Sequence, residues 1–338
     1  MTAATASAAH GASNVRRALR ARWMPPALAY LALLTTVAAL APAFFSAGNL
    51  RDVALNSAAV LLVAVGMTIV ILAGEIDISV GSLFAVCSVA AGWLAHAGVP
   101  MPLVPICVMV IGAAMGAING VLVGRLRLPS IIVTLAMLVA WRDALRWATG
   151  GAWIQDLPPD FQWFGLSPAA AQWLIVVLSS GVTAGFAWTL RHLAAGRAVY
   201  AVGSDHEAAR LAGIEPSLVV MGAFVVTGTL VGLAAVLNAV RFAAVPSNAG
   251  VGLELQAVAA VVVGGTSITG GRGSLLGTVI GVALLGTIGT ALTFAGISPT
   301  WTQAIQGLII LAALATDAAL SRLARHARAL VVGRAAAR

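Results

Sequence analysis

Two carboxylates interrupt a long apolar region of the chain, where charged side chains are costly. The stretch reads Gly74, Glu75, Ile76, Asp77, Ile78, Ser79, Val80, Gly81 and Ser82. A charge at membrane depth costs about 3 kcal/mol or more, so such residues are usually paired or functional. One interpretation is a tight cytoplasmic turn in which Ser79 is the N-cap of the next helix. The other is an unwound segment in which Asp77 and Ser79 line a polar path.

Glu75 and Asp77 also fit a different chemistry, the binding of a proton or a sodium ion inside a membrane. A transporter driven by an ion gradient would use them as its ion site. An enzyme would need a paired histidine and acid or a serine–histidine pair at membrane depth, and none is present. Cys87 and Cys107 form no cysteine–histidine cluster. We therefore expect no catalytic residue and no metal site.

A second break, residues 261–274, joins two apolar runs through glycines and hydroxyl residues. Glycine-rich loops can hold phosphates. A P-loop, however, requires a lysine, and the chain contains no lysine. We expect this break to pack helices through small residues and the chain not to hydrolyse ATP itself. Its similarity to the first break hints at an internal duplication.

The longest charged stretch in the middle of the chain is the loop 191–217. Within it, Ser204 and Glu207 have the spacing of a capping box. Gly213 is placed to end a helix in the left-handed conformation. We predict a short exposed helix over residues 205–212, suited to contact a soluble partner. An ordinary amphipathic connector is the alternative.

The composition places these features in a membrane. The 338 residues are 60% hydrophobic and only 9% charged, against about 25% charged in soluble domains. Backbone groups in lipid must be paired internally, so the apolar runs are expected to be helices. We predict an all-α polytopic membrane protein with about ten transmembrane helices. The runs are 27–45, 53–73, 78–95, 101–123, 128–148, 170–190, 218–240, 254–269, 274–296 and 300–317.

The arginines predict how these spans are oriented. With both termini cytoplasmic, fifteen arginines lie on the cytoplasmic side and four outside, as the positive-inside rule expects. The sequence contains no basic-aromatic module of the kind that indicates nucleic-acid binding. We interpret residues 1–26 as a partly disordered cytoplasmic arm, 27–317 as the transmembrane domain and 318–338 as a basic cytoplasmic tail. The first apolar run is too long for a signal-peptide core and is expected to remain as a helix.

Several motifs resemble those of known transport proteins. Glu207, Ala208, Ala209 and Gly213 match the E-A-A-x-x-x-G pattern that bacterial ABC importer permeases present to their ATPase subunits. The stretch 74–82 resembles a signature of the ribose/xylose-type sugar permeases, and residues 255–274 resemble their second signature. Glu75 stands where many sugar permeases have glycine. In this departure the chain resembles the rhamnose and autoinducer-2 permeases.

The resemblance implies a subunit of an ATP-driven importer for a monosaccharide or a sugar-like solute in the bacterial inner membrane. It implies an ATP-binding partner that holds the ATP and magnesium, a periplasmic solute-binding protein, and pairing with a second copy or a sibling permease. The residues that would couple to the ATPase are Ser204, Glu207, Ala208, Ala209, Arg210 and Gly213.

A path for a neutral polyol needs hydroxyl or amide groups and few charges. Asn119, Thr134 and Asn238 each lie in an apolar run and are candidates for such a path, together with Asp77 and Ser79. Each of the three could equally make a hydrogen bond between helices.

Overall fold

The computed structural model describes residues 23–294 and five further positions, 301, 304, 307, 308 and 311. Within them every regular element is a helix, and the one β contact is an isolated bridge between Ile154 and Val245. The all-α prediction is therefore confirmed. Residues 1–22 of the expected arm, the expected tail and most of the tenth run lie outside the described residues, while the last residues of the arm form the start of α2.

The described α-helices follow the expected runs closely. They are α2 (Met24–Leu40), α3 (Ala47–Leu72), α4 (Val80–His96), α5 (Val104–Gly120), α6 (Ser130–Thr149), α7 (Pro168–His192), α8 (Ala194–Ser204), α9 (His206–Leu211), α10 (Pro216–Ala239), α11 (Leu253–Val263) and α12 (Leu275–Phe294). Three short elements join them, namely η1 (Pro42–Phe45), the π-helical η2 (Val121–Arg125) and η3 (Gln162–Gly165). Each of the first nine expected runs corresponds to one of these α-helices, while α8 and α9 lie in the charged loop.

Five of the helical segments are long and apolar enough to cross a membrane: α3, α5 with η2, α7, α10 and α12. The helices α2, α4 and α11 are apolar but shorter. The fifth expected span forms one continuous helix, α6, although Arg142, Asp143 and Arg146 lie toward its end. The protein is thus a polytopic membrane protein.

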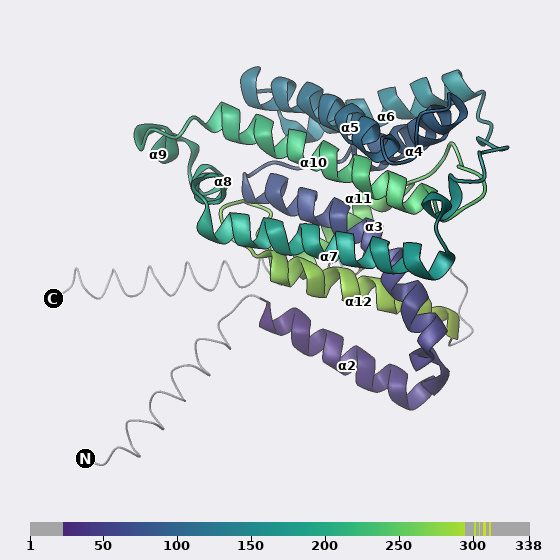
Figure 1. Ribbon diagram of the computed structural model, residues 1–338. Helices are drawn as coiled ribbons and strands as arrows, with labels where there is room; N and C mark the ends of the chain where they lie inside the picture. Colours follow the sequence, from purple (N-terminus) through teal and green to yellow (C-terminus); the bar gives the residue numbers. More distant parts are fainter. Residues whose placement is uncertain (1–22, 295–300, 302–303, 305–306, 309–310, 312–338) are drawn as a thin grey trace, which may run out of the picture.

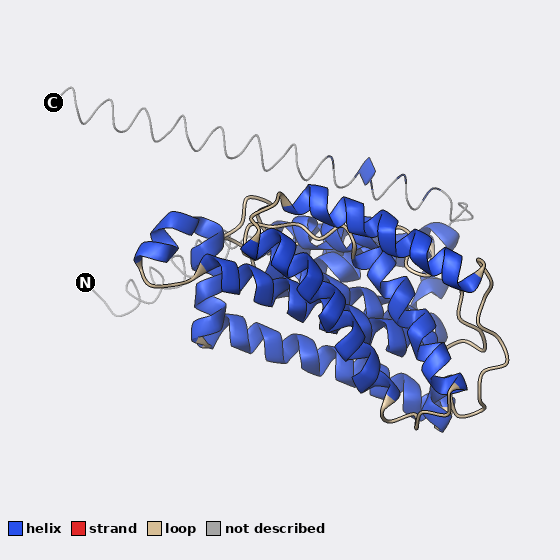
Figure 2. Cartoon of the chain, turned by 90° about the horizontal axis from the view of Figure 1, so that it is seen from above, coloured by secondary structure: helices blue, strands red, loops and turns tan. Residues whose placement is uncertain are grey.

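The helices lie side by side (Figures 1 and 2), and α3 and α10 lie in the middle of the bundle (Figure 1). Every residue from 62 to 72 of α3 is buried. α10 packs against α5, α3 and α4. One close crossing joins α5 to α10, where a Cβ atom on Gly228 would overlap the carbonyl oxygen of Gly112. Small residues at such crossings let membrane helices approach and gain van der Waals contact.

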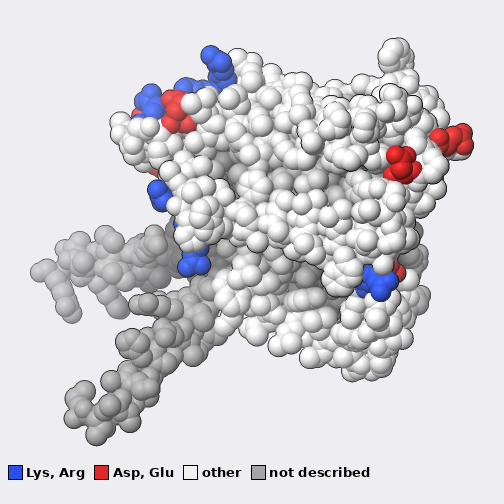
Figure 3. Space-filling view, in the orientation of Figure 1, with Lys and Arg blue, Asp and Glu red and all other residues white. Residues whose placement is uncertain are grey.

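The two ends of the bundle differ from its middle. On the face that Figure 3 shows, the charged side chains lie at the two ends, and the band between them carries none. α8 and α9 lie at one end, and the connection from α6 to α7 lies at the other (Figure 1). This distribution suits a protein whose middle faces lipid and whose ends face water. We refer to the end that carries α9 as the α9 end.

Candidate functional site

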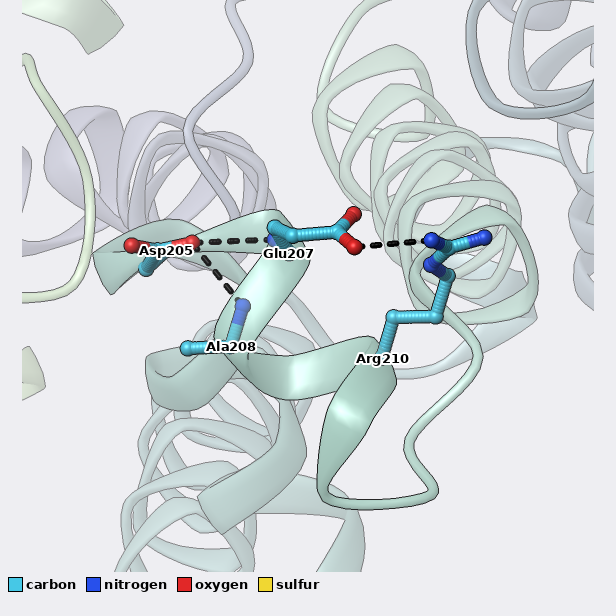
Figure 4. Close-up of polar contacts among 4 residues, drawn as sticks. All are labelled: Asp205, Glu207, Ala208 and Arg210. Atoms are coloured by element: carbon cyan, nitrogen blue, oxygen red, sulfur yellow. Dashed lines mark hydrogen bonds and ion pairs between the residues drawn. The ribbon is translucent and has the colours of Figure 1, made fainter.

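The exposed helix predicted within the charged loop is present as α9, but its N-cap is not the expected residue. Asp205 is the cap, and its Oδ1 accepts hydrogen bonds from the backbone N–H groups of Glu207 (2.9 Å) and Ala208 (3.0 Å) (Figure 4). The predicted capping box is therefore wrong. Ser204 is the last residue of α8, and its hydroxyl donates to the carbonyl of Tyr200 at 2.7 Å. A serine inside a helix commonly bonds back in this way.

Glu207 does not reach back to a cap. It instead accepts a hydrogen bond of 2.7 Å from Nη2 of Arg210, three residues further on (Figure 4). This bond raises the pKa of the Arg210 guanidinium above its ordinary value. Both side chains are exposed, so the pair contributes little to stability. The pair orders two charged groups on the outer surface of α9, where a partner protein can contact them.

The other end of α9 is as predicted. Gly213 has a φ of 81°, in the left-handed region. The N–H of Gly213 donates to the carbonyl of Arg210, and the N–H of Ile214 donates to the carbonyl of Ala209. These two bonds make a Schellman motif. Both ends of α9 are thus capped by neighbouring residues, and the helix keeps its form although only Ala209 is buried.

Sequence reasoning missed α8, the helix that carries α9. Its buried residues are Gly196, Val199, Val202 and Gly203, which follow the three-and-four spacing of one helix face. That spacing is the signal that could have revealed α8. The hydroxyl of Tyr200 donates to the carbonyl of Gly273 at 3.1 Å and so ties α8 to the second break.

The two breaks, which the sequence shows far apart, meet at the end of α8. A Cβ atom on Gly203 would overlap the carbonyl oxygen of Leu72, at the end of α3, and lie 2.7 Å from the nitrogen of Gly271. Gly271 donates its N–H to that same oxygen of Leu72 at 3.0 Å. A Cβ atom on Gly270 would lie 2.8 Å from the Cα of Gly74. We call Gly74, Gly203, Gly270 and Gly271 the glycine junction, since only glycines allow three backbones to approach so closely.

The first break also contains a buried polar cluster. Oδ1 of Asp77 accepts hydrogen bonds from the N–H (3.0 Å) and the hydroxyl (2.6 Å) of Ser79, and Nδ2 of Asn119 donates to that hydroxyl at 2.9 Å. All three side chains are fully buried. Ser79 occupies the N-cap position of α4 but makes no side-chain cap, so its predicted capping role is wrong. Its hydroxyl donates to Asp77 and accepts from Asn119, and it accepts no backbone N–H of α4.

The remaining predicted path residues lie apart from one another. Thr134 is buried at the start of α6, and its hydroxyl donates to the carbonyl of Ser130 at 2.8 Å. Ser130 in turn accepts a bond of 3.3 Å from the N–H of Ile76, so α6 is fixed to the first break. Asn238 lies half-buried near the end of α10. A role for any of these residues in solute passage stays a prediction.

Comparison with known proteins identifies the family. The family model described as "Branched-chain amino acid transport system / permease component" matches residues 49–314. The chain belongs to this permease family. Members are translocation subunits and not enzymes. No solved structure matches the chain.

Three similar relatives of this permease carry the same name, "Autoinducer 2 import system permease protein LsrC". The proteins of Enterobacter sp. (strain 638) and Klebsiella pneumoniae subsp. pneumoniae are each 37% identical over 323 residues, which cover 94% of this chain and 92% of the relative. The protein of Escherichia coli O157:H7 is 35% identical over 297 residues, 87% of this chain and 86% of its own. The relatives agree with the resemblance to the ribose/xylose-type permeases.

The permease has a charged pocket of about 480 Å³ at its α9 end. Charged or titratable side chains line it from the first break, the connection between η2 and α6, α9 and the N-cap of α10. They are Glu75, Arg127, His206, Glu207, Arg210 and Glu215. Burial raises the pKa of Glu75, while the hydroxyl of Ser130 and the charge of His206 oppose that shift. Glu75 and Asp77 thus have separate surroundings, one in an open pocket and one in a closed cluster.

Replacement of Asp205 by alanine tests the cap of α9. Loss of an N-cap side chain costs a helix about 1 kcal/mol, so amide hydrogen exchange in residues 206–211 is expected to accelerate about fivefold. Ser204→Ala is the matched control, because the Ser204 hydroxyl bonds within α8. Hydrogen-exchange mass spectrometry on the purified permease measures both. Faster exchange in Ser204→Ala than in Asp205→Ala would show that Ser204, and not Asp205, caps α9.

Proposed function

We propose that this permease is the membrane subunit of an ATP-driven importer that brings a neutral sugar-like solute into a bacterial cell across the inner membrane. Autoinducer-2 is the first solute to test, because the relatives are named for its import. ATP and magnesium would bind to a partner ATP-binding subunit. A periplasmic solute-binding protein would deliver the solute, and a second copy or a sibling permease would complete the membrane part.

The observation that carries this proposal is the form of α9. It is an exposed helix with two ordered charges, Glu207 and Arg210, and with both ends capped by its own segment. Nothing in the described core requires such a helix, since only Ala209 is buried. A partner that binds ATP would contact α9 as one rigid unit. The absence of lysine, and so of a P-loop, supports placing ATP in that partner.

The glycine junction supports a mechanism for transmitting movement. α9 follows α8 directly, and Gly203 at the end of α8 touches the backbone where α3 ends and where the second break turns. Packed backbones have no soft side chain between them, so they shift together. Approach of two ATP-binding subunits would push α9, and α8 would carry that push to α3 and α12. The bundle would then change from outward-facing to inward-facing.

Uptake into proteoliposomes tests the proposed function. The permease is reconstituted with its ATP-binding subunit and solute-binding protein, and accumulation of autoinducer-2, ribose, xylose and rhamnose is measured. We expect uptake of at least one of these solutes when ATP is supplied on the side of the membrane that carries the ATP-binding subunit. Uptake should stop when the ATP-binding subunit is omitted. A proton or sodium gradient alone should give none. Uptake driven by such a gradient without the ATP-binding subunit would instead establish an ion-coupled transporter.

A further inference from the structure

A cavity of about 190 Å³ lies between α3, α11 and α12. None of the five predicted path residues lines it. We call it the α3–α12 cavity. Its polar lining and the glycines that open it come from three helices and are Asn56, Ser57, Gln256, Gly286, Gly289 and Thr290.

The lining has the chemistry that a neutral hydroxylated solute requires. Two amides and two hydroxyls offer both donors and acceptors, and the rest of the lining is valine, leucine and glycine. No acid or base lines the cavity. The neighbouring Arg241 donates from Nη2 to Oδ1 of Asn56 at 2.8 Å. This bond occupies the amide oxygen of Asn56 and leaves its nitrogen to donate to another group.

Glycine on α12 keeps the cavity open. A Cβ atom on Gly286 would lie 2.8 Å from the hydroxyl oxygen of Ser57, so a larger residue there would displace this hydroxyl. The cavity is also smaller than the roughly 300–1,000 Å³ of sites that hold drug-sized ligands. A small solute is therefore a better fit than a nucleotide or a peptide.

The cavity lies in the half of the bundle away from the α9 end. Asn56 and Ser57 are in the first half of α3, whereas the glycine junction contacts Leu72 at its end. Thr290 is near the end of α12 that is farther from the second break. With α9 facing the cytoplasm, a solute delivered from outside reaches this half first.

We propose that the α3–α12 cavity binds the imported solute, a neutral polyhydroxylated molecule, through hydrogen bonds from its hydroxyls to Ser57, Gln256 and Thr290. The proposal rests on the proposed function and names where the solute binds. It requires that removing one of these polar groups weakens uptake while the bundle stays folded.

Gln256→Leu removes the amide at nearly constant volume. Loss of one hydrogen-bond partner for a bound hydroxyl should raise the solute concentration for half-maximal uptake about tenfold. Gln172→Leu is the matched control, a half-buried glutamine of α7 that does not line the cavity. Both variants are assayed in the full importer with autoinducer-2, ribose, xylose and rhamnose. Equal uptake by the two variants in an importer whose wild type is active would overturn the site and leave the proposed function standing.

Thiol protection provides a second readout that does not depend on transport. Thr290→Cys is made in a background where Cys87 and Cys107 are alanine, and is treated with a water-soluble thiol reagent. We expect this cysteine to be labelled. A solute that the wild type transports should slow the labelling severalfold. Thr293→Cys, one turn on and exposed, should label without protection. Absence of labelling at 290, or equal labelling with and without solute, contradicts the site. If the wild-type importer moves no solute at all, the proposed function fails and this site fails with it.

Discussion

Replacement of Gly203 by valine is expected to lower ATP-driven uptake at least about tenfold while the permease still inserts in the membrane. A side chain at this position would collide with the carbonyl of Leu72 and crowd the nitrogen of Gly271, and both are backbone atoms that cannot turn aside. Overpacking of this kind typically costs about 1–3 kcal/mol. α8 must then move away from α3, and the push on α9 is no longer passed on. Uptake into proteoliposomes, with co-purification of the ATP-binding subunit, measures the two effects separately.

Gly222→Val is the control for this prediction. Gly222 is also a helical glycine, in α10, but a Cβ atom there meets nothing within 4 Å. The control should transport as the wild type does. If Gly203→Val binds the ATP-binding subunit and also transports normally, movement does not pass through the glycine junction.

The spans could be predicted because each depends on local composition. Long apolar runs bounded by glycine, proline or charge become helices in lipid whatever their neighbours are. α6 shows where this rule weakens. Arg142 and Arg146 lie within its second half, yet it forms one helix. Nη1 of Arg142 donates to the carbonyl of Ala249 in the connection before α11. A contact across 107 residues leaves no local trace in the sequence.

The cap of α9 was assigned to the wrong residue for a physical reason. Ser204 and Asp205 are adjacent, and both residue types cap helices well. The choice depends on where α8 ends, because a serine that is still helical bonds to its own helix. The spacing of Gly196, Val199 and Gly203 shows that α8 continues to that point. Once α8 is recognised, Asp205 is the first residue free to cap α9.

The glycine junction and the α3–α12 cavity could not be predicted. Each is built from helices that are distant in the chain, and their lining residues are ordinary glycines, amides and hydroxyls. Asn56 and Gln256 are separated by 200 positions and share no motif. A polar side chain within an apolar run is the criterion that predicts the path residues. That criterion finds buried hydrogen bonds, such as Asn119 to Ser79, as readily as it finds a cavity.

Asp77→Ala is expected to destabilise the permease strongly, whereas Asp77→Asn is expected to be tolerated. Alanine removes the acceptor for both the N–H and the hydroxyl of Ser79, in a fully buried place. Each unpaired buried donor costs about 1–3 kcal/mol, so the loss should be about 2–6 kcal/mol. Asparagine keeps Oδ1. It also brings an N–H₂ group into a cluster where Oδ1 of Asn119 is buried without a partner among the described residues.

The same pair of variants separates the two classes of transporter. An ion site needs the charge of Asp77, and an amide cannot replace it. A structural acceptor needs only the oxygen. We therefore expect Asp77→Asn to retain uptake within about threefold of the wild type, as expected for a hydrogen bond that is kept, and Asp77→Ala to lose it together with its thermal stability in detergent. An Asp77→Asn permease that melts like the wild type but transports nothing would show that the carboxylate itself takes part in transport.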